Sequence, residues 1–428
     1  MGVTAAARAT SDTYLVGAPT DPQLRRIGEN ILAEVHAAAL KALAHAEDSK
    51  RFPLAGDPLE RLFARRLSQK PAAQVRRAAT RARTNDGKPE VLSTLDLTSP
   101  VAVSTQLAKA LPSVKLTKPG LMSAVEKPGI AADSDWMGLD EERGDPDIES
   151  VKPFLTRGVL KAVKEENGGG IVLKPPATKP KPKLKFVPYD GVRLRLIKMV
   201  CVEETTGGGD DEIALAGIAT AANGKTHKLS PFMVSDSFDS GESVQFGLSF
   251  NLNTGKVTDS GPREFFSFGY GTDNTVKHPQ LGTLKLDWPR VYHATFLLAE
   301  IDNGGFPGFV TDLFNLVKEK AAAAVGAAVG AMIGGVVGST IPGLGTAIGA
   351  AVGAIVGWVL GELWSLFMVW WEDDEFVPIT VAVKRNNQFS RFINESSFDS
   401  SNKVVWWKGH GGHYKLKFDW QMVGGLAA

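Results

Sequence analysis

The hydrophobic and polar positions follow three patterns along the chain, and each pattern predicts a different kind of structure. As far as residue 84, apolar residues recur at helical spacing. From residue 187 onward, short runs alternate between apolar and polar positions, as in strands. Inside this second region, the 41 residues from 321 to 361 carry no charge. The sequence therefore predicts a multidomain α+β protein with an unusual apolar block.

Residues 1–84 are predicted to form a helical module. Thr20-Asp21-Pro22 is typical of a helix start, because a capping side chain precedes a proline that fits the first turn. The apolar residues that follow share one helical face: Leu24, Ile27, Ile31, Val35 and Ala38. Asp57-Pro58 repeats the start signal, and a third helix is predicted over 72–83.

Residues 85–186 are predicted to connect this module to the rest of the chain. Their first part is rich in Pro, Ser, Thr and Asp and lacks sustained periodicity, although a short helix is plausible near 148–166. Interleaved Lys and Pro follow from Lys174 to Lys185, a composition that favours extended polyproline II over a packed core. We interpret this part as a tether.

Residues 187–428 are predicted to form an antiparallel β-sandwich, because the strand-like runs are short and frequent turns separate them. Strands are expected within the ranges 192–196, 212–218, 243–250, 263–268, 282–286, 292–300, 379–383, 403–407 and 413–420. A hydrophobic helical hairpin, residues 308–371, is inserted between two of these strands.

The apolar block divides into two helical arms. Its length exceeds the ~20 residues of one membrane helix and suits two. Pro342 and Gly343 lie in a cluster of helix breakers and are predicted to form the hairpin turn. In each arm glycines recur every four residues, at Gly326, Gly330, Gly334 and Gly338, and at Gly345, Gly349, Gly353, Gly357 and Gly361. Such stripes allow two helix backbones to approach closely in a membrane, so these glycines are the predicted membrane-inserting and helix-packing residues.

The second arm also contains tryptophans that suit the boundary between lipid and water. Trp358, Trp364, Trp370 and Trp371 are the predicted interface anchors. The acidic residues 372–375 then mark the end of the hairpin. Low pH is one candidate trigger for insertion, because protonation of Glu362 and of this acidic cluster would lower the cost of moving them towards lipid.

These features resemble those of known membrane-active proteins over about 50 residues. The glycine pattern resembles the glycine-zipper segments of bacterial membrane proteins. The two-armed layout resembles the hydrophobic hairpin of pore-forming colicins and related toxins. The resemblance implies a membrane-active bacterial effector or toxin, with a lipid bilayer as partner and a homo-oligomer as a possible assembly.

Charge adds an expectation about partners and delivery. The net charge of +1 indicates no general affinity for nucleic acid, although residues 1–83 carry 14 Lys/Arg against 8 Asp/Glu. This local excess is a solvated face or a docking surface for a carrier or secretion apparatus. No aromatic residues interleave with the arginines, which disfavours nucleic acid. We expect synthesis in the cytoplasm without a signal peptide and delivery by an injection system to a target membrane.

No arrangement of residues predicts an enzyme, a cofactor or a metal centre. A nucleophile with an adjacent base is not evident, and His410 and His413 flank two glycines typical of a turn. Asp210, Asp211 and Asp302 are weak candidates for calcium ligands at strand ends, with ordinary turn aspartates as the alternative. The competing hypothesis for the whole chain is a soluble assembly or binding protein that oligomerises through the Ala/Gly hairpin.

Overall fold

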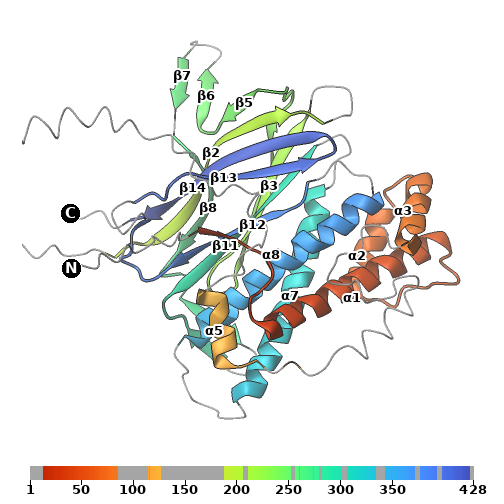
Figure 1. The fold of residues 1–428 in the computed structure, drawn as a ribbon, viewed down its shortest axis with the longest axis horizontal. Coiled ribbons are helices and arrows are strands. Elements are labelled where there is room, and N and C mark those ends of the chain that lie inside the picture. Colours follow the sequence, from red (N-terminus) through yellow and green to blue (C-terminus); the bar gives the residue numbers. More distant parts are fainter. Residues whose placement is uncertain are drawn as a thin grey trace, which may run out of the picture.

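A computed structural model shows an α+β protein, which confirms the predicted fold class. The structure describes residues 13–84, 114, 116–126, 188–205, 211–251, 256–259, 261–272, 274–278, 282–300, 306–333, 343–371, 376–392 and 398–424. Within these residues the helices gather on one side and the antiparallel strands on the other (Figure 1).

The N-terminal elements follow the predicted helix signals. A short strand, β1 (Thr13–Leu15), precedes α1 (Pro22–Glu47), α2 (Pro58–Leu67) and α3 (Ala72–Thr84). The carboxylate of Asp21 caps α1 by accepting hydrogen bonds from the backbone N–H of Gln23 and Leu24, at 2.9 and 3.0 Å. Asp57 caps α2 in the same way, through the N–H of Leu59.

Two antiparallel sheets form the β-sandwich. The first, called here the inner sheet, has the strand order β1-β12-β11-β3-β4. The second, the outer sheet, has the order β13-β14-β2-β5, and β8 also pairs with β2. Two small ribbons, β10-β9 and β6-β7, complete the strands. Their bounds are β2 (Gly191–Glu203), β3 (Ile213–Thr220), β4 (Thr226–Ser235), β5 (Ser243–Gln245), β6 (Leu248–Asn251), β7 (Lys256–Asp259), β8 (Arg263–Gly269), β9 (Thr275–His278), β10 (Gly282–Lys285), β11 (Arg290–Glu300), β12 (Ile379–Arg385), β13 (Lys403–Gly409) and β14 (Gly412–Val423).

Aromatic side chains fill the space between the two sheets. Phe296 of β11 lies with its ring centroid 5.3 Å from that of Phe418 on β14 and 6.4 Å from that of Trp407 on β13. Phe268 of β8 lies 5.1 Å from Tyr292 of β11. Because side chains alternate along a strand, the neighbours of Phe296 on β11 point away from this core and towards the helices.

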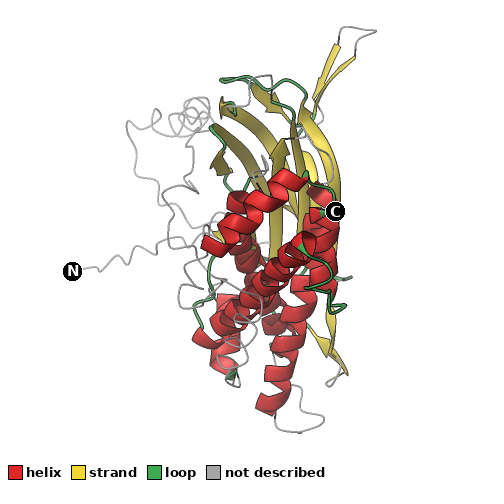
Figure 2. Ribbon diagram, turned by 90° about the vertical axis from the view of Figure 1, so that its right-hand side faces the viewer, coloured by secondary structure: helices red, strands yellow, loops and turns green. Residues whose placement is uncertain are grey.

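The helices form a third layer on the other face of the inner sheet. Two long helices, α7 (Phe306–Ile333) and α8 (Leu344–Trp371), lie between β11 and β12 in sequence, as predicted for the inserted hairpin. Helix α8 lies directly on the inner sheet and contacts β11 and β12. Helices α1, α3, α5 and α7 contact it from the other side (Figures 1 and 2).

The N-terminal helices share one hydrophobic core with the hairpin. Buried side chains of α1, α2, α3, α7 and α8 belong to the same cluster, and the inner sheet contributes Val291 and Leu297 to it. Strand β1 pairs with the edge strand β12. The helices within residues 13–84 therefore cover α8 and share its core.

One helix in the predicted connection was not foreseen. Helix α5 (Lys118–Glu126) packs against α8 through buried residues that include Leu121 and Val125. The helix predicted near 148–166 and the Lys/Pro tether lie outside the described residues.

Candidate functional site: the buried glycine-zipper hairpin

Helix α8 combines the length of a membrane helix with the burial of a core helix. Among the described residues, one helical stretch, Leu344–Trp364, is long and apolar enough to cross a membrane. Yet 94% of it is buried inside the protein. The hydrophobic surface that a bilayer would receive is thus covered by protein in this structure.

The glycine stripe of α8 faces the inner sheet. A Cβ atom at Gly349 would overlap the carbonyl oxygen of Ala222, and one at Gly353 would overlap the ring of His293. At Gly357 it would lie 2.8 Å from Thr380 Cγ2, and at Gly345 it would lie 3.1 Å from Leu286 Cδ2. These four glycines let the helix backbone approach the strands closely, as small residues do between membrane helices.

In this structure the glycine stripe of the second arm meets the inner sheet, while its predicted role in packing helices within a membrane stays a prediction. The four-residue spacing keeps the glycines on one face, but the surface they meet is the sheet. Gly361 continues the stripe beyond the sheet, and its Cβ position has no atom within 4 Å.

Larger side chains of α8 face the other helices and pack against them. Trp358 packs where α1 passes, and a Cβ at Gly28 of α1 would lie 2.5 Å from its Cζ3 atom. Val352, Ile355 and Val359 are also buried in the core that α8 shares with the helices. Close fit on both faces therefore holds α8 between the sheet and the helical cover.

The start of α8 is anchored by Asp287, which follows β10. The Asp287 carboxylate accepts a hydrogen bond from the Gly343 N–H at 2.7 Å, and its backbone carbonyl accepts one from the Thr346 hydroxyl at 2.7 Å. Gly343 has φ +80° in a turn immediately before the helix, which places it where the hairpin turn was predicted. Pro342 lies outside the described residues.

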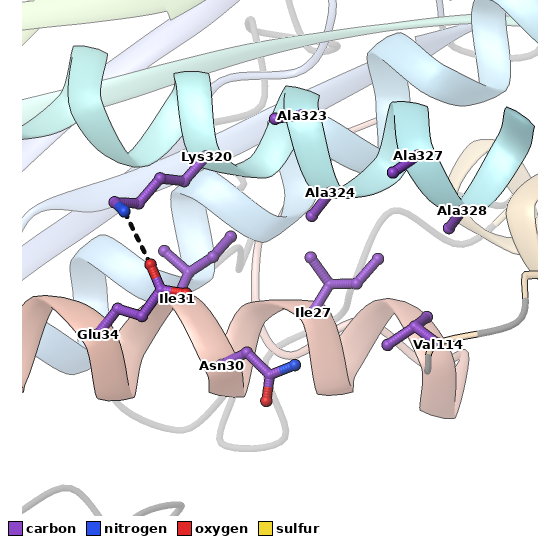
Figure 3. A pocket seen from close by; sticks show the side chains of 10 residues that line it. All are labelled: Ile27, Asn30, Ile31, Glu34, Val114, Lys320, Ala323, Ala324, Ala327 and Ala328. Carbon is purple, nitrogen blue, oxygen red and sulfur yellow. Dashed lines mark hydrogen bonds and ion pairs between the residues drawn. The ribbon is translucent and has the colours of Figure 1, made fainter. Parts of the chain in front are cut away.

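The first arm is less well covered than the second. Gly326 is buried in α7 and Gly330 lies in the same helix, while Gly334 and Gly338 lie outside the described residues. Ala322, Ala323 and Ala327 are exposed. A groove of about 490 Å³ separates this face of α7 from Ile27 and Ile31 of α1 (Figure 3).

An ion pair closes one end of this groove. Lys320 Nζ lies 2.8 Å from Glu34 Oε2, and the two side chains connect α7 to α1 (Figure 3). Both groups are partly exposed, so such a pair contributes ~0–1 kcal/mol. Along this groove, α7 is held to α1 by weaker contacts than those that hold α8 to the sheet.

The tryptophans predicted as interface anchors are core residues where the structure describes them. Trp364 is fully buried, and Trp358 is 5% exposed. The indole Nε1 of Trp358 donates a hydrogen bond to Glu362 at 3.0 Å. The side chains of Trp370 and Trp371, in the last turn of α8, lie outside the described residues. Trp358 and Trp364 therefore pack inside the protein here and do not mark a surface.

Of the three calcium candidates, the structure describes Asp211 alone. Asp210 and Asp302 lie outside the described residues, and no cluster of three metal-ligating side chains occurs among the described residues. Asp211 is buried, and its carboxylate accepts hydrogen bonds from the Thr205 N–H, the Thr205 hydroxyl and the Tyr414 hydroxyl. These donors join the outer sheet to the loop before β3, which is a structural role.

The fold and site define an α+β protein that carries an internal glycine-zipper hairpin. Residues 319–364 match the family model of the glycine zipper, which confirms the predicted glycine-zipper segment. The matched segment covers the apolar part of α7, the hairpin turn and α8 as far as Trp364. No curated protein and no solved structure matches the chain.

Proposed function

We propose that the protein is a membrane-active effector whose hairpin leaves its buried position and inserts into a lipid bilayer. The glycine-zipper match supports a membrane-associated role for residues 319–364. Delivery by an injection system and pore formation by several copies complete the proposal.

The observation that carries the proposal is that α8 suits two environments, the interior of this protein and the hydrocarbon of a bilayer. Only Glu362 is charged among the 28 residues of α8, so transfer to hydrocarbon carries one obvious electrostatic cost. The same helix has a glycine face that is covered by the inner sheet. Pairing through that face, with α7 or with a second copy, requires α8 to leave the sheet first.

The first arm supports a paired insertion. Alanine and glycine dominate α7 beyond Lys320, and such residues contribute little to insertion on their own. Its exposed alanine face is nevertheless free of charge, so α7 can follow α8 as the second half of a hairpin. The weaker contacts along the groove oppose this movement less than the contacts of α8 do.

A double substitution on the exposed face of α7 tests insertion without disturbing the fold. Ala323→Lys with Ala327→Lys places two ammonium groups where both positions are exposed. In a bilayer centre each charge costs ~2.5–3.5 kcal/mol on insertion scales. We expect unchanged thermal unfolding, with dye release from phosphatidylglycerol and phosphatidylethanolamine vesicles reduced at least tenfold.

Asn30→Lys is the control, because it leaves the Lys320–Glu34 ion pair intact. It adds positive charge to the same groove from α1, which does not belong to the hairpin, so vesicle leakage should persist. Failure of the wild-type protein to release dye or to float with these vesicles at any pH contradicts the proposal.

The exposed alanine face of α7 also favours one alternative function, a protein that self-associates through the hairpin without lipid. In that case the lysine variant would lose a wild-type oligomer, measured by light scattering in the absence of vesicles. Wild-type protein that is monomeric without lipid, and that releases dye from vesicles, favours membrane insertion instead.

A further inference from the structure

His293 of β11 lies at the contact between α8 and the inner sheet. It is 3% exposed, and its imidazole ring occupies the space that a side chain at Gly353 would need. Both ring nitrogens are buried without a hydrogen-bond partner. The ring therefore fills the interface as a neutral group, although histidine is the side chain that most readily gains a proton between pH 5 and 8.

Among the described residues of the elements packed around it, no acidic group faces this imidazole. Gly353 faces it from α8, whose single charged residue is Glu362, further along the helix. In the strand register, Thr220 of β3 and Ala382 of β12 lie opposite His293. Strand β3 has no ionisable residue.

The charged residues of β11 itself and of the neighbouring β12 would not stabilise a protonated ring. Lys384 lies on the same face of β12 as Ala382, and its Nζ atom lies 3.4 Å from the Glu126 carbonyl oxygen of α5. Arg290 and Glu300 stand at the two ends of β11, and the Arg290 guanidinium donates to the carbonyl oxygens of Tyr270 and Leu286. An added proton on His293 would thus be a buried charge without a counter-ion among the described residues.

We propose that His293 is an acid-sensitive contact whose protonation expels α8 from the inner sheet. The inference deepens the proposed membrane function, because it names the step that frees the hairpin. Because position 353 is a glycine, the backbone of α8 lies directly against the His293 ring. A charged, hydrated imidazole therefore does not fit while α8 remains on the sheet.

The direction of the pH effect follows from the burial of the ring. Burial lowers the pKa of His293 from 6.5 to about 4. Above pH 6.5 the imidazole is neutral whether α8 is covered or released, and protonation has no effect on the equilibrium. Below that pH the released state gains the proton first, and the equilibrium shifts towards release by about tenfold per pH unit at first, reaching about 150-fold at pH 4 and approaching about 300-fold at still lower pH.

Two reporters within the intact chain separate release of α8 from general unfolding. Amide hydrogen exchange of peptides from 344–364, corrected for the pH dependence of intrinsic exchange, measures release. Cys201, the single cysteine, is fully buried in the sandwich, and its reaction with 4,4′-dithiodipyridine measures opening of the sandwich.

The experiment compares the wild-type protein with His293→Leu and His293→Gln between pH 7 and pH 4. We expect the wild-type α8 peptides to lose protection as the pH falls, while Cys201 stays unreactive. In both variants the acid-induced fall in the protection factor of the α8 peptides should be at least tenfold smaller than in the wild-type protein. If the leucine variant does not fold, the glutamine variant alone provides the test. His45→Gln is the control, because His45 bonds the Phe52 carbonyl at 2.9 Å, within the helical cover.

Two results would overturn the inference. One is an equal loss of α8 protection in the wild-type protein and in both His293 variants. The other is reaction of Cys201 at the same pH at which α8 begins to exchange.

Vesicle leakage and flotation, measured in parallel on the same proteins, separate this inference from the proposed function. Leakage that is equal at pH 7 and pH 4 and equal in the variants leaves membrane activity standing and rejects His293 as the trigger. Release of α8 that depends on His293, with no vesicle binding at any pH, keeps the acid-sensitive contact and rejects the membrane function.

Discussion

The carbonyl oxygen of Ala222 occupies the position at which a side chain on Gly349 would begin. Ala222 lies in the tight turn between β3 and β4, where the Gly224 N–H donates to the Ala221 carbonyl at 2.8 Å. The contact is therefore between two backbones, neither of which can move aside as a flexible side chain would. It fixes the height of α8 above the inner sheet.

Gly349→Ala should consequently destabilise the protein, although alanine is the better helix former. Overpacking of this kind costs ~1–3 kcal/mol, and the immobile turn places this site at the upper end of that range. Chemical denaturation monitored by circular dichroism measures the change. The variant should also expose α8 to hydrogen exchange, because the helix must rise from the sheet.

Gly361→Ala is the matched substitution on the same stripe. Its Cβ would meet no atom within 4 Å, so the gain in helix propensity remains unopposed and should stabilise the protein by ~0.5–1 kcal/mol. Equal effects of the two substitutions would show that the close contact at Ala222 does not exist in solution.

The stripe shows what the sequence can predict about this site. The spacing of the glycines places Gly345, Gly349, Gly353 and Gly357 on one face of α8, because this property depends only on helix geometry. It does not predict which surface meets that face. A sheet and a second helix both accept a backbone at close range, and the three-dimensional contacts of α8 with β11 and β12 show that the sheet is the surface met here.

Features that depend on neighbouring residues in the chain could be predicted, whereas contacts between distant segments could not. The caps at Asp21 and Asp57 are local, so the sequence predicts α1 and α2 correctly. His293 was one of several scattered histidines, and only the strand register and the position of Gly353 reveal its contact. Trp358 and Trp364 have the composition of membrane anchors, yet the cover formed by the helices makes them core residues.

The helical cover should control access of α8 to membranes. Gly28→Ala on α1 would place a methyl group against the Trp358 ring, at 2.5 Å from Cζ3, and push the cover away from α8. We expect faster hydrogen exchange in α8 and an increase in vesicle leakage of at least threefold at neutral pH. Asn30→Ala, which changes the neighbouring groove without touching Trp358, should leave both measurements unchanged. Tighter protection of α8 in the Gly28 variant would contradict this role for α1.

The anchor at Asp287 should hold the hairpin turn in place. Its carboxylate satisfies the Gly343 N–H at the start of α8, where a negative charge also complements the helix dipole. Asp287→Ala should destabilise the protein by ~1–2 kcal/mol, and Asp287→Asn, which keeps an acceptor oxygen, should cost less. Hydrogen exchange should rise most in the first turn of α8. Uniform exchange along the whole helix would instead indicate that Asp287 acts on the fold as a whole.

The hydrogen bonds of Asp211 lead to a prediction about both stability and calcium. Burial raises the pKa of Tyr414, so its hydroxyl stays protonated and donates to the buried carboxylate. Tyr414→Phe removes this donor and should lower the free energy of unfolding by ~1–3 kcal/mol.

Millimolar calcium should leave the melting temperature of the wild-type protein unchanged, because Thr205 and Tyr414 already occupy the carboxylate oxygens. A rise in melting temperature with calcium that disappears in Asp211→Asn would show that this carboxylate exchanges its protein donors for a metal ion. Differential scanning calorimetry with calcium, with magnesium and with a chelator decides between the two outcomes.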